Sequence, residues 1–171
     1  RHEVIALVRS AEKTVQPGDG VVLRYGDITH RDSLLRAMEG ADGVFHLAGW
    51  YKVGMRDTSP AYPVNVEGTR NVLACMEALA IPKGVYTSTL AVFSDTKGRI
   101  ADEAYRYHGK HLSEYDRTKW IAHYEVALPW MSKGLPLVIV QPGLVYGPGD
   151  PSAFGQTLKQ YLEGRLPVLP K

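Results

Sequence analysis

Short apolar segments alternate with helical patterns along almost the whole of this 171-residue chain. The apolar segments predict strands at residues 4–8, 21–25, 43–47, 85–89 and 137–140. Between the third and fourth of them, apolar residues recur at helical spacing through residue 80. Strands that are apolar throughout and alternate with helices form parallel sheets with both faces covered. The sequence therefore predicts an α/β fold with a doubly wound parallel sheet.

Polar residues and glycines gather just after the predicted strands. Asp27 follows the second strand, and residues 46–49 (His-Leu-Ala-Gly) follow the third. Ser88 and Thr89 end the fourth strand, and residues 141–143 (Gln-Pro-Gly) follow the fifth. Ligands of open parallel sheets bind beyond the carboxyl ends of the strands. We therefore expect the functional site at this edge of the sheet.

The composition of the chain bears on which partners, nucleic acids, membranes or metal ions, the protein could bind. The formal net charge is +2 and the basic residues are scattered, so no nucleic acid is expected. No apolar run is long enough to span a membrane, and the single Cys75 fits a reducing cytoplasm. His108, His111 and Glu114 lie three apart across a loop–helix junction without a further ligand, so we expect no metal site.

Local signals predict where helices begin and end. Thr29 and Asp32 resemble a capping box, and Gly40 can end the helix that follows. Ser113 is predicted to start a later helix, and Pro129 to kink or end it.

Within that later helix, Tyr115 and Lys119 lie one turn apart and share a helix face. A phenol is a poor acid near neutral pH, but a nearby ammonium favours the phenolate and makes the phenol a usable proton donor. The alternative is a solvent-exposed pair, because this spacing also occurs by chance.

Taken together, these motifs resemble an extended short-chain dehydrogenase/reductase of the NAD(P)-dependent epimerase/dehydratase type, in its dihydroflavonol-reductase-like branch. The matching segments are 26–28, 44–49, 65–73, 85–89, 115–119 and 141–149. The resemblance implies a Rossmann-like fold and a catalytic group of Thr89, Tyr115 and Lys119. In that family the Tyr is the acid/base, the Lys lowers its pKa and holds the nicotinamide ribose, and the Ser/Thr hydroxyl bonds the substrate oxygen.

The same resemblance implies the residues around the cofactor. They are Arg9, Ser10, Asp27, Ile28, Leu47, Ala48, Gly49, Asn65, Tyr115, Lys119, Pro142 and Val145. Tyr51 and Lys52 are candidates for substrate contact. An acidic residue after the second strand of the family signals NAD, whereas an Arg accommodates the 2′-phosphate of NADP. Here Val8 stands at the acidic position and Arg9 follows it, so we expect NADP; a solvated Arg9 is the alternative.

Two departures from the family pattern are expected to matter. The glycine-rich loop that binds the pyrophosphate is absent from the 171 residues, and Arg1 matches the end of the family's first helix. We therefore expect residues 1–150 to form a partial NAD(P)-binding domain that lacks the first strand, and residues 151–171 to begin a substrate-binding lobe. We expect a gap in the sheet before the strand at Val44, and no activity for the chain by itself.

The leading functional hypothesis is NADP(H)-dependent reduction of a ketone or aldehyde, a small-molecule carbonyl substrate. The alternative within the superfamily is a nucleotide-sugar epimerase or dehydratase with bound NAD. Dehydratases tend to carry an Asp-Glu pair after the catalytic hydroxyl, where this chain has Leu90-Ala91. A non-catalytic redox sensor or RNA-binding relative is the alternative from another class. The helices bearing Val72 and Trp120 are candidate faces of a homodimer.

Overall fold

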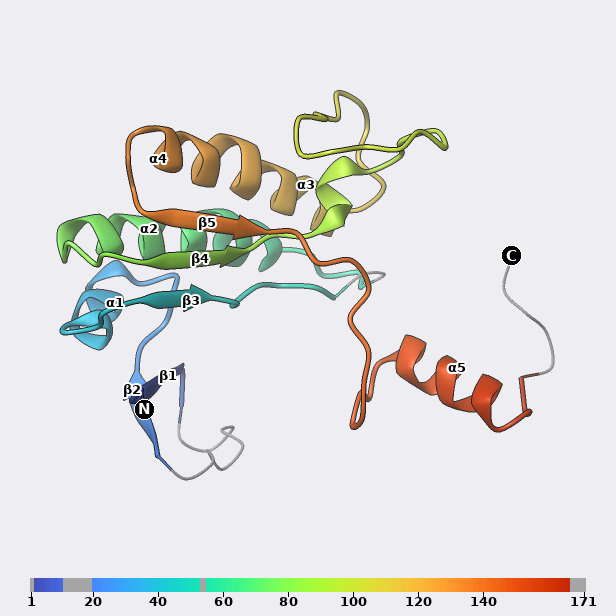
Figure 1. Cartoon of the computed structure of the whole chain (residues 1–171), viewed down its shortest axis with the longest axis horizontal. Helices are drawn as coiled ribbons and strands as arrows, with labels where there is room; N and C mark the ends of the chain where they lie inside the picture. Colours follow the sequence, from blue (N-terminus) through green and yellow to red (C-terminus); the bar gives the residue numbers. More distant parts are fainter. Residues whose placement is uncertain (1, 11–19, 53–54, 167–171) are drawn as a thin grey trace. The chain divides into compact units, whose positions relative to one another are not determined.

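The computed structural model describes residues 2–10, 20–52 and 55–166 of the chain. The chain divides into two compact units, Arg1–Gln141 and Pro142–Lys171. The first unit holds the described strands and most of the helices, and the second holds α5 (Ala153–Leu162) (Figure 1). Each unit is described by itself.

Two parallel sheets make up the strand structure of the first unit. β1 (Val4–Val8) pairs with β2 (Val21–Tyr25), and the three-stranded sheet has the order β3 (Val44–His46), β4 (Gly84–Thr87), β5 (Leu137–Val140). The predicted strands are thus confirmed, with the third and fourth shorter than expected. No described strand joins β2 to β3, so the predicted gap in the sheet is confirmed.

The helical segments of the first unit follow the strands in alternation. They are α1 (Arg31–Met38), η1 (Pro63–Glu67), α2 (Gly68–Ala78), η2 (Leu90–Phe93), α3 (Glu114–Ile121), η3 (Ala122–Ala127) and α4 (Leu128–Ser132). Two of them, η1 and η3, are π-helical, and η2 is a 3₁₀ turn. The segments α3, η3 and α4 follow one another without a break and form one continuous helix (Figure 1).

One prediction about the start of a helix is wrong. The cap of α1 is His30, with no side-chain cap bond, because the Thr29 hydroxyl donates to Asp27 Oδ1 instead (2.8 Å). Of the two outcomes predicted for Pro129, a kink or an end, the end does not occur at this residue, because the helix continues to Ser132. The π-helical segment directly before α4 changes the hydrogen-bond register, so Pro129 stands in the first turn of a new α-helical segment, where its missing N–H is tolerated.

The main core lies between one face of the β3–β4–β5 sheet and the helices α2 and η3. Tyr86 and Leu137 from the sheet pack there with Leu73 of α2 and Val126 of η3. The opposite face of the sheet carries alternate residues of its outer strands, and these are exposed: Phe45 (75%), Val138 (59%) and Val140 (40%). Helices of the described part of the first unit therefore cover only one face, whereas both were expected to be covered.

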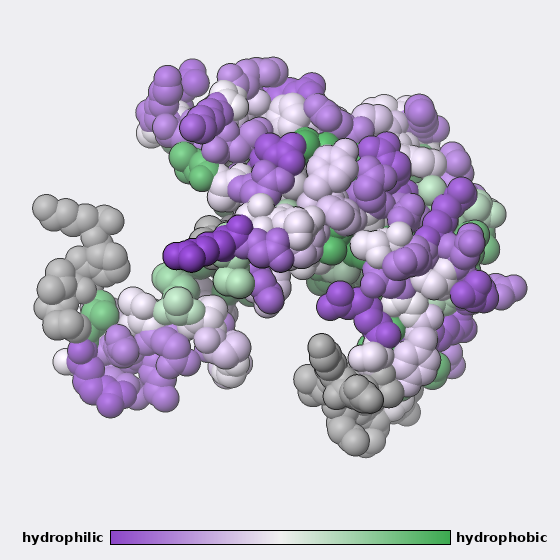
Figure 2. All heavy atoms as spheres, turned by 180° about the vertical axis from the view of Figure 1, so that it is seen from behind, coloured by the Kyte–Doolittle hydropathy of each residue, from purple (hydrophilic) through white to green (hydrophobic). Residues whose placement is uncertain are grey.

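Polar residues take the outward positions of the covering helices. Arg70 and Glu77 of α2 are exposed, whereas Val72 and Met76 are buried. On the side of the molecule shown in Figure 2, hydrophilic side chains predominate and hydrophobic ones form small separate patches. No helix in the described ranges has the length and apolarity needed to cross a membrane.

Candidate active site

Helix α3 brings Tyr115 and Lys119 to the carboxyl end of β4. The Ser113 side chain accepts a hydrogen bond from the backbone N–H of Asp116 (3.1 Å), which confirms the predicted start of this helix. Tyr115 is half-buried, and Lys119 is only 5% exposed. The predicted face shared by the phenol and the ammonium therefore turns inward, against the alternative of a solvent-exposed pair.

The Lys119 ammonium is held by two groups of β4. Its Nζ donates to the backbone oxygen of Thr87 (2.9 Å) and to the phenol oxygen of Tyr86 (3.2 Å). Nζ also lies 4.7 Å from the centroid of the Tyr86 ring. Burial lowers the pKa of Lys119 to about 8, because the charged form loses its hydration. The ammonium is therefore still charged at neutral pH and loses its proton under mildly alkaline conditions.

Tyr115 lies near the same phenol. Burial raises the pKa of Tyr86, and the electrostatic influence of Tyr115 raises it further. Tyr115 is therefore near enough to Tyr86 to act on its charge, and Tyr86 in turn contacts the Lys119 ammonium. A fixed positive charge in the surroundings of a phenol is what general acid catalysis by that phenol needs.

The strand end supplies two neighbouring hydroxyls with different surroundings. Ser88 is buried, and its hydroxyl shares a hydrogen bond with Nδ1 of His123 (2.8 Å). Thr89 is half-buried, and its oxygen accepts from the N–H of Ala91 (3.2 Å), which caps η2. Because that bond uses only the oxygen, the Thr89 proton stays available for an acceptor. The geometry therefore favours Thr89 over Ser88 as a group that contacts a ligand.

Asn65 of η1 connects two parts of the site through its side-chain amide. Its amide accepts from the N–H of Trp50 (2.7 Å) and donates to the Trp50 oxygen (3.0 Å) and to the Thr118 hydroxyl (2.9 Å). Asn65 is 1% exposed, so these bonds tie the loop after β3 to helix α3. The structure gives Asn65 a supporting role; direct cofactor contact by this residue remains a prediction.

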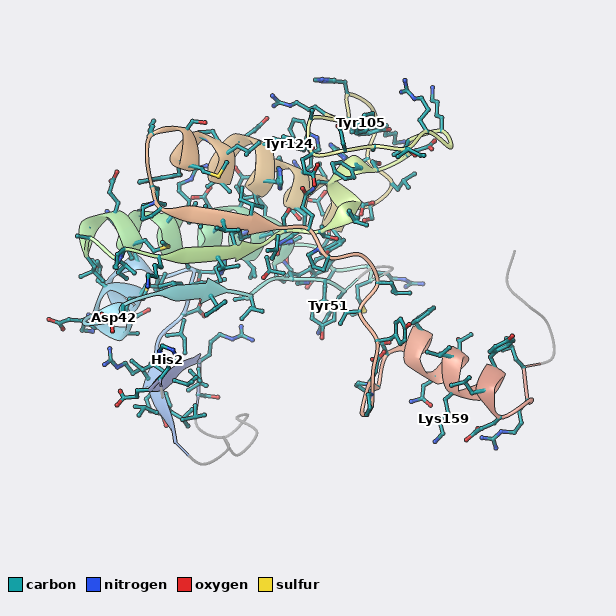
Figure 3. All side chains as sticks on the ribbon, in the orientation of Figure 1. His2, Asp42, Tyr51, Tyr105, Tyr124 and Lys159 are labelled. Carbon is teal, nitrogen blue, oxygen red and sulfur yellow. The ribbon has the colours of Figure 1, made fainter. Side chains whose placement is uncertain are left out.

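Three of the residues predicted to bind the cofactor lie in the loop after β3. Leu47, Ala48 and Gly49 are exposed there, and so are Tyr51 and Lys52, the candidates for substrate contact. Figure 3 labels Tyr51 on this loop. Pro142 and Val145 belong to the second unit, so their part in the site stays a prediction.

The residues predicted around the adenine end follow β1 and β2. The backbone N–H of Gly26 donates to the oxygen of Val8 (3.1 Å), which joins the two strand ends. Burial raises the pKa of Asp27, but hydrogen bonds from Thr29 and the charge of Arg9 outweigh this effect and keep the pKa below its usual value. Arg9 is therefore near enough to Asp27 to act on its charge. The side chain of Ile28 is buried in the core, which leaves only its backbone near this edge.

Buried polar residues lie behind the site, and of these the sequence analysis had considered only His46, in the 46–49 segment. His46 bonds through Nε2 to the Thr69 hydroxyl (2.9 Å) and stacks on Tyr86 (5.3 Å between ring centroids). Burial and the charge of Lys119 lower the pKa of His46 to about 3 and that of His123 to about 4. His123 could have been found, since it stands one helical turn beyond Lys119. Thr69 and Tyr86 lie within segments that match the family, but nothing in the sequence shows that their side chains meet His46.

The remaining aromatic residues of α3 and η3 fasten the loop that precedes them. The Tyr124 hydroxyl donates to the backbone oxygen of Tyr105 (2.7 Å), and Figure 3 shows these two residues side by side. The Arg106 guanidinium lies 4.9 Å from the centroid of the Trp120 ring. His111, one of the three residues weighed as metal ligands, contacts Trp120 through its ring, and Glu114 is held by Arg117.

The parallel α/β fold and the Tyr–Lys helix beside a strand-end hydroxyl define an enzyme class, the extended short-chain dehydrogenases/reductases. The model of the NAD dependent epimerase/dehydratase family matches residues 1–169. The chain belongs to this family.

The curated relatives include both reductases and epimerases. A Synechocystis sp. protein, provisionally named dihydroflavonol 4-reductase, is 35% identical, and the match covers 98% of this chain and 50% of the relative. The 2-alkyl-3-oxoalkanoate reductase of Stenotrophomonas maltophilia is 34% identical, with 96% of this chain and 50% of the relative covered. The N-acetyl-alpha-D-glucosaminyl-diphospho-ditrans,octacis-undecaprenol 4-epimerase of Escherichia coli O157:H7 is 32% identical, with 85% and 44% covered. The chain thus spans about half the length of these relatives.

Solved structures agree with the fold. The crystal structure of gox2253 matches with a TM-score of 0.81 at 29% identity, covering 95% of this chain and 51% of that one. The UDP-glucuronic acid 4-epimerase from Bacillus cereus, solved in complex with NAD, matches with a TM-score of 0.68 at 26% identity and covers 85% and 47%.

Proposed function

We propose that the protein containing this chain is an NADP(H)-dependent oxidoreductase that reduces a ketone or an aldehyde. The observation that carries the proposal is the buried Lys119 ammonium on the helix face of Tyr115, next to the strand that ends in Thr89. Relatives named as reductases support the same direction.

The residues present fit a nicotinamide cofactor at its ribose end. An ammonium has three N–H donors, and Lys119 gives two of them to described residues, so one is available for a ribose hydroxyl. The exposed loop 47–49 would lie beside it, at the strand end where such folds bind nucleotides. When bound, the reduced cofactor supplies the hydride that adds to the carbonyl carbon.

The chain's own residues would handle the oxygen of that carbonyl. The Thr89 and Tyr115 hydroxyls donate hydrogen bonds to it and stabilise the negative charge that develops there. Tyr115 then transfers its phenolic proton to the oxygen and completes the alcohol. The positive charge of Lys119 stabilises the phenolate that remains.

NADP rather than NAD is proposed because Arg9 follows β1, where the family's NAD-binding members carry an acidic residue. A guanidinium can bind a 2′-phosphate through two parallel hydrogen bonds. The proximity of Arg9 to Asp27 supports a position at the edge where the adenosine half of the cofactor would bind.

Epimerisation of a nucleotide sugar with bound NAD is the second candidate. It is favoured by epimerases among the similar proteins, one of them solved with NAD. The two functions differ in a simple observable, because a reductase consumes external NADPH in proportion to product, whereas an epimerase regenerates its cofactor in every cycle.

Tyr115→Phe tests the proposed function in the protein that contains this chain. This change removes the proton donor and keeps the ring, so turnover should fall by about two to four powers of ten with NADPH affinity nearly unchanged. Tyr124→Phe removes another buried phenol and should retain most of the turnover. The measurement is steady-state NADPH oxidation with a panel of ketones and aldehydes. Unchanged turnover of Tyr115→Phe with every accepted substrate would show that Tyr115 is not the acid.

A further inference from the structure

We propose that Tyr86 is a positioning residue that holds the Lys119 ammonium in place and keeps it charged. This role deepens the proposed function and rests on it. Tyr86 lies in the middle strand of the sheet and is fully buried, at 0% exposure. It is therefore a phenol that no substrate can reach, yet it contacts the ammonium of the site.

One close contact joins Tyr86 to Lys119. The phenol oxygen accepts a hydrogen bond from Nζ (3.2 Å), and the ring centroid lies 4.7 Å from the same nitrogen. A hydrogen-bond acceptor favours the charged form of a lysine. This contact would weaken or vanish if Lys119 were neutral and turned away.

The surroundings of Tyr86 fix its ring and give Lys119 a lone pair of its oxygen. The Thr69 hydroxyl donates to the backbone oxygen of Asn65 (2.7 Å), so its oxygen accepts in the bond with Nε2 of His46 (2.9 Å). The ring of His46 stacks on the ring of Tyr86, with 5.3 Å between the centroids. Because an ammonium can only donate, the phenol oxygen of Tyr86 is the acceptor in its bond with Lys119.

The other groups around Lys119 cannot replace Tyr86. His46 on β3 and His123 on η3 are both kept neutral by burial and by the Lys119 charge, with pKa values lowered to about 3 and about 4. Tyr115 on α3 is the acid that Lys119 serves. The ion pairs of the described residues include no carboxylate partner for Lys119. Apart from the backbone oxygen of Thr87, the charge thus depends on the phenol of Tyr86.

The consequence concerns the pH at which the site works. The folded protein already holds the pKa of Lys119 near 8. Loss of the phenol oxygen removes an acceptor from the charged form and lowers this pKa further. Activity that needs the ammonium falls as pH rises through that pKa, so the alkaline limb of the pH–rate profile should move toward neutral pH in Tyr86→Phe.

The experiment compares Tyr86→Phe with Tyr124→Phe in the protein that contains this chain. Both changes delete one buried phenol hydroxyl, but the hydroxyl of Tyr124 bonds the backbone oxygen of Tyr105, away from Lys119. Lysine side chains are labelled with ¹³C at Cε and titrated by NMR, with the Lys119 signal assigned by Lys119→Arg. We expect the pKa of Lys119 to drop by about one unit in Tyr86→Phe, with an equal shift of the alkaline limb. In Tyr124→Phe the pKa of Lys119 and the alkaline limb of the pH–rate profile should both keep their wild-type values. An unchanged Lys119 titration in Tyr86→Phe would overturn the proposal.

A second pair of changes decides the matter if Tyr86→Phe does not fold. Replacing Tyr86 by 3-fluorotyrosine keeps the phenol and its shape but makes its oxygen a weaker acceptor, and the same replacement at Tyr124 is the control. We expect a smaller drop of the Lys119 pKa in the first and the wild-type value in the second. Equal titrations in both would refute the role of Tyr86. The NMR titration does not need turnover, so failure of this inference is distinguishable from failure of Tyr115→Phe to impair reduction.

Discussion

Burial sets the protonation states of His46 on β3 and His123 on η3, both of which feel the charge of Lys119. Their exposed fractions are 4% each. A buried imidazole is expensive to charge, and a neighbouring ammonium adds repulsion. Each histidine therefore stays neutral and serves as a hydrogen-bond partner, His46 for Thr69 and His123 for Ser88. Protonation of either would disrupt the site and the fold together.

This predicts a loss of stability in mild acid. Both histidines have folded-state pKa values far below the usual 6.5, about 3 for His46 and about 4 for His123, so the unfolded chain binds protons first as pH falls. The free energy of unfolding should decline below about pH 6.5, by up to about 1.4 kcal/mol per pH unit for each histidine. Urea unfolding at pH 7, 6 and 5 measures this. In His123→Gln the free energy of unfolding should decrease less as the pH falls, whereas in the control His2→Gln, at an exposed histidine, it should decrease as in the wild type. An unchanged pH dependence in His123→Gln would contradict the assignment.

Arg9 carries the prediction about cofactor choice. A charge-assisted hydrogen bond contributes about 1.5–3 kcal/mol, which corresponds to a roughly ten- to hundredfold preference for NADPH over NADH. Arg9→Ala should abolish most of this preference. Arg36→Ala, which removes an exposed arginine of α1, should preserve it. Fluorescence titrations with both cofactors measure the ratio, and equal affinities in the unmodified protein would rule out the NADP assignment.

At the scale of elements, close packing of α2 on β4 depends on the absence of a side chain at Gly84. A Cβ at this position would collide with the end of Met76 and would lie 3.1 Å from a methyl group of Leu137. Gly43, at the start of the neighbouring strand, has its nearest neighbour at 3.6 Å, an ordinary contact.

Gly84→Ala should therefore destabilise the protein by about 1–3 kcal/mol, because overpacking forces neighbouring side chains to shift. Gly43→Ala serves as the matched control and should change the free energy of unfolding by less. Urea unfolding at neutral pH compares the two. A Gly84→Ala protein as stable as the Gly43→Ala protein would show that Met76 yields without cost.

The elements also show what the sequence could and could not predict. The positions of the strands could be predicted from short apolar runs, because strands that are buried in a sheet consist mainly of apolar residues. The start of α1 was not predicted correctly. The Thr29 hydroxyl can bond either a backbone N–H of the helix or the Asp27 carboxylate, and it bonds Asp27. The π-helical segments η1 and η3 were also missed, because such segments depend on packing between helices and have no local signal.

For the site as a whole, Thr89, Tyr115 and Lys119 came from a family pattern, and their catalytic roles stay a prediction. The contact of Lys119 with Tyr86, and the stacking of His46 on Tyr86, could not be predicted in the same way. They join residues of α3, β4 and β3 that meet only in the folded protein. A tyrosine in an apolar strand is expected in the core whether or not its hydroxyl has a role, so its chemistry becomes visible only from its partners.

The whole molecule yields a prediction for residues 1–171 expressed by themselves. One face of the three-stranded sheet exposes Phe45, Val138 and Val140, and among the described strands β3 pairs only with β4. Exposed apolar faces and unpaired edges promote aggregation. The sequence also contains no glycine-rich loop of the kind whose amides bind a pyrophosphate. We therefore expect aggregation or a broad melting transition, no saturable NADPH binding and no reductase activity.

Size-exclusion chromatography, thermal unfolding and NADPH fluorescence test this expectation together. A Phe45→Ser/Val138→Thr double variant makes the sheet face more polar, so its soluble fraction should rise. Cofactor binding should not return in that variant, because polarity on the sheet face supplies no phosphate-binding amides. A monomer of residues 1–171 that melts sharply and binds NADPH at micromolar concentration would contradict both parts of the argument. Binding without a sharp transition would contradict only the second, since it would mean that Lys119, Tyr115 and the loop 47–49 hold the cofactor without a pyrophosphate loop.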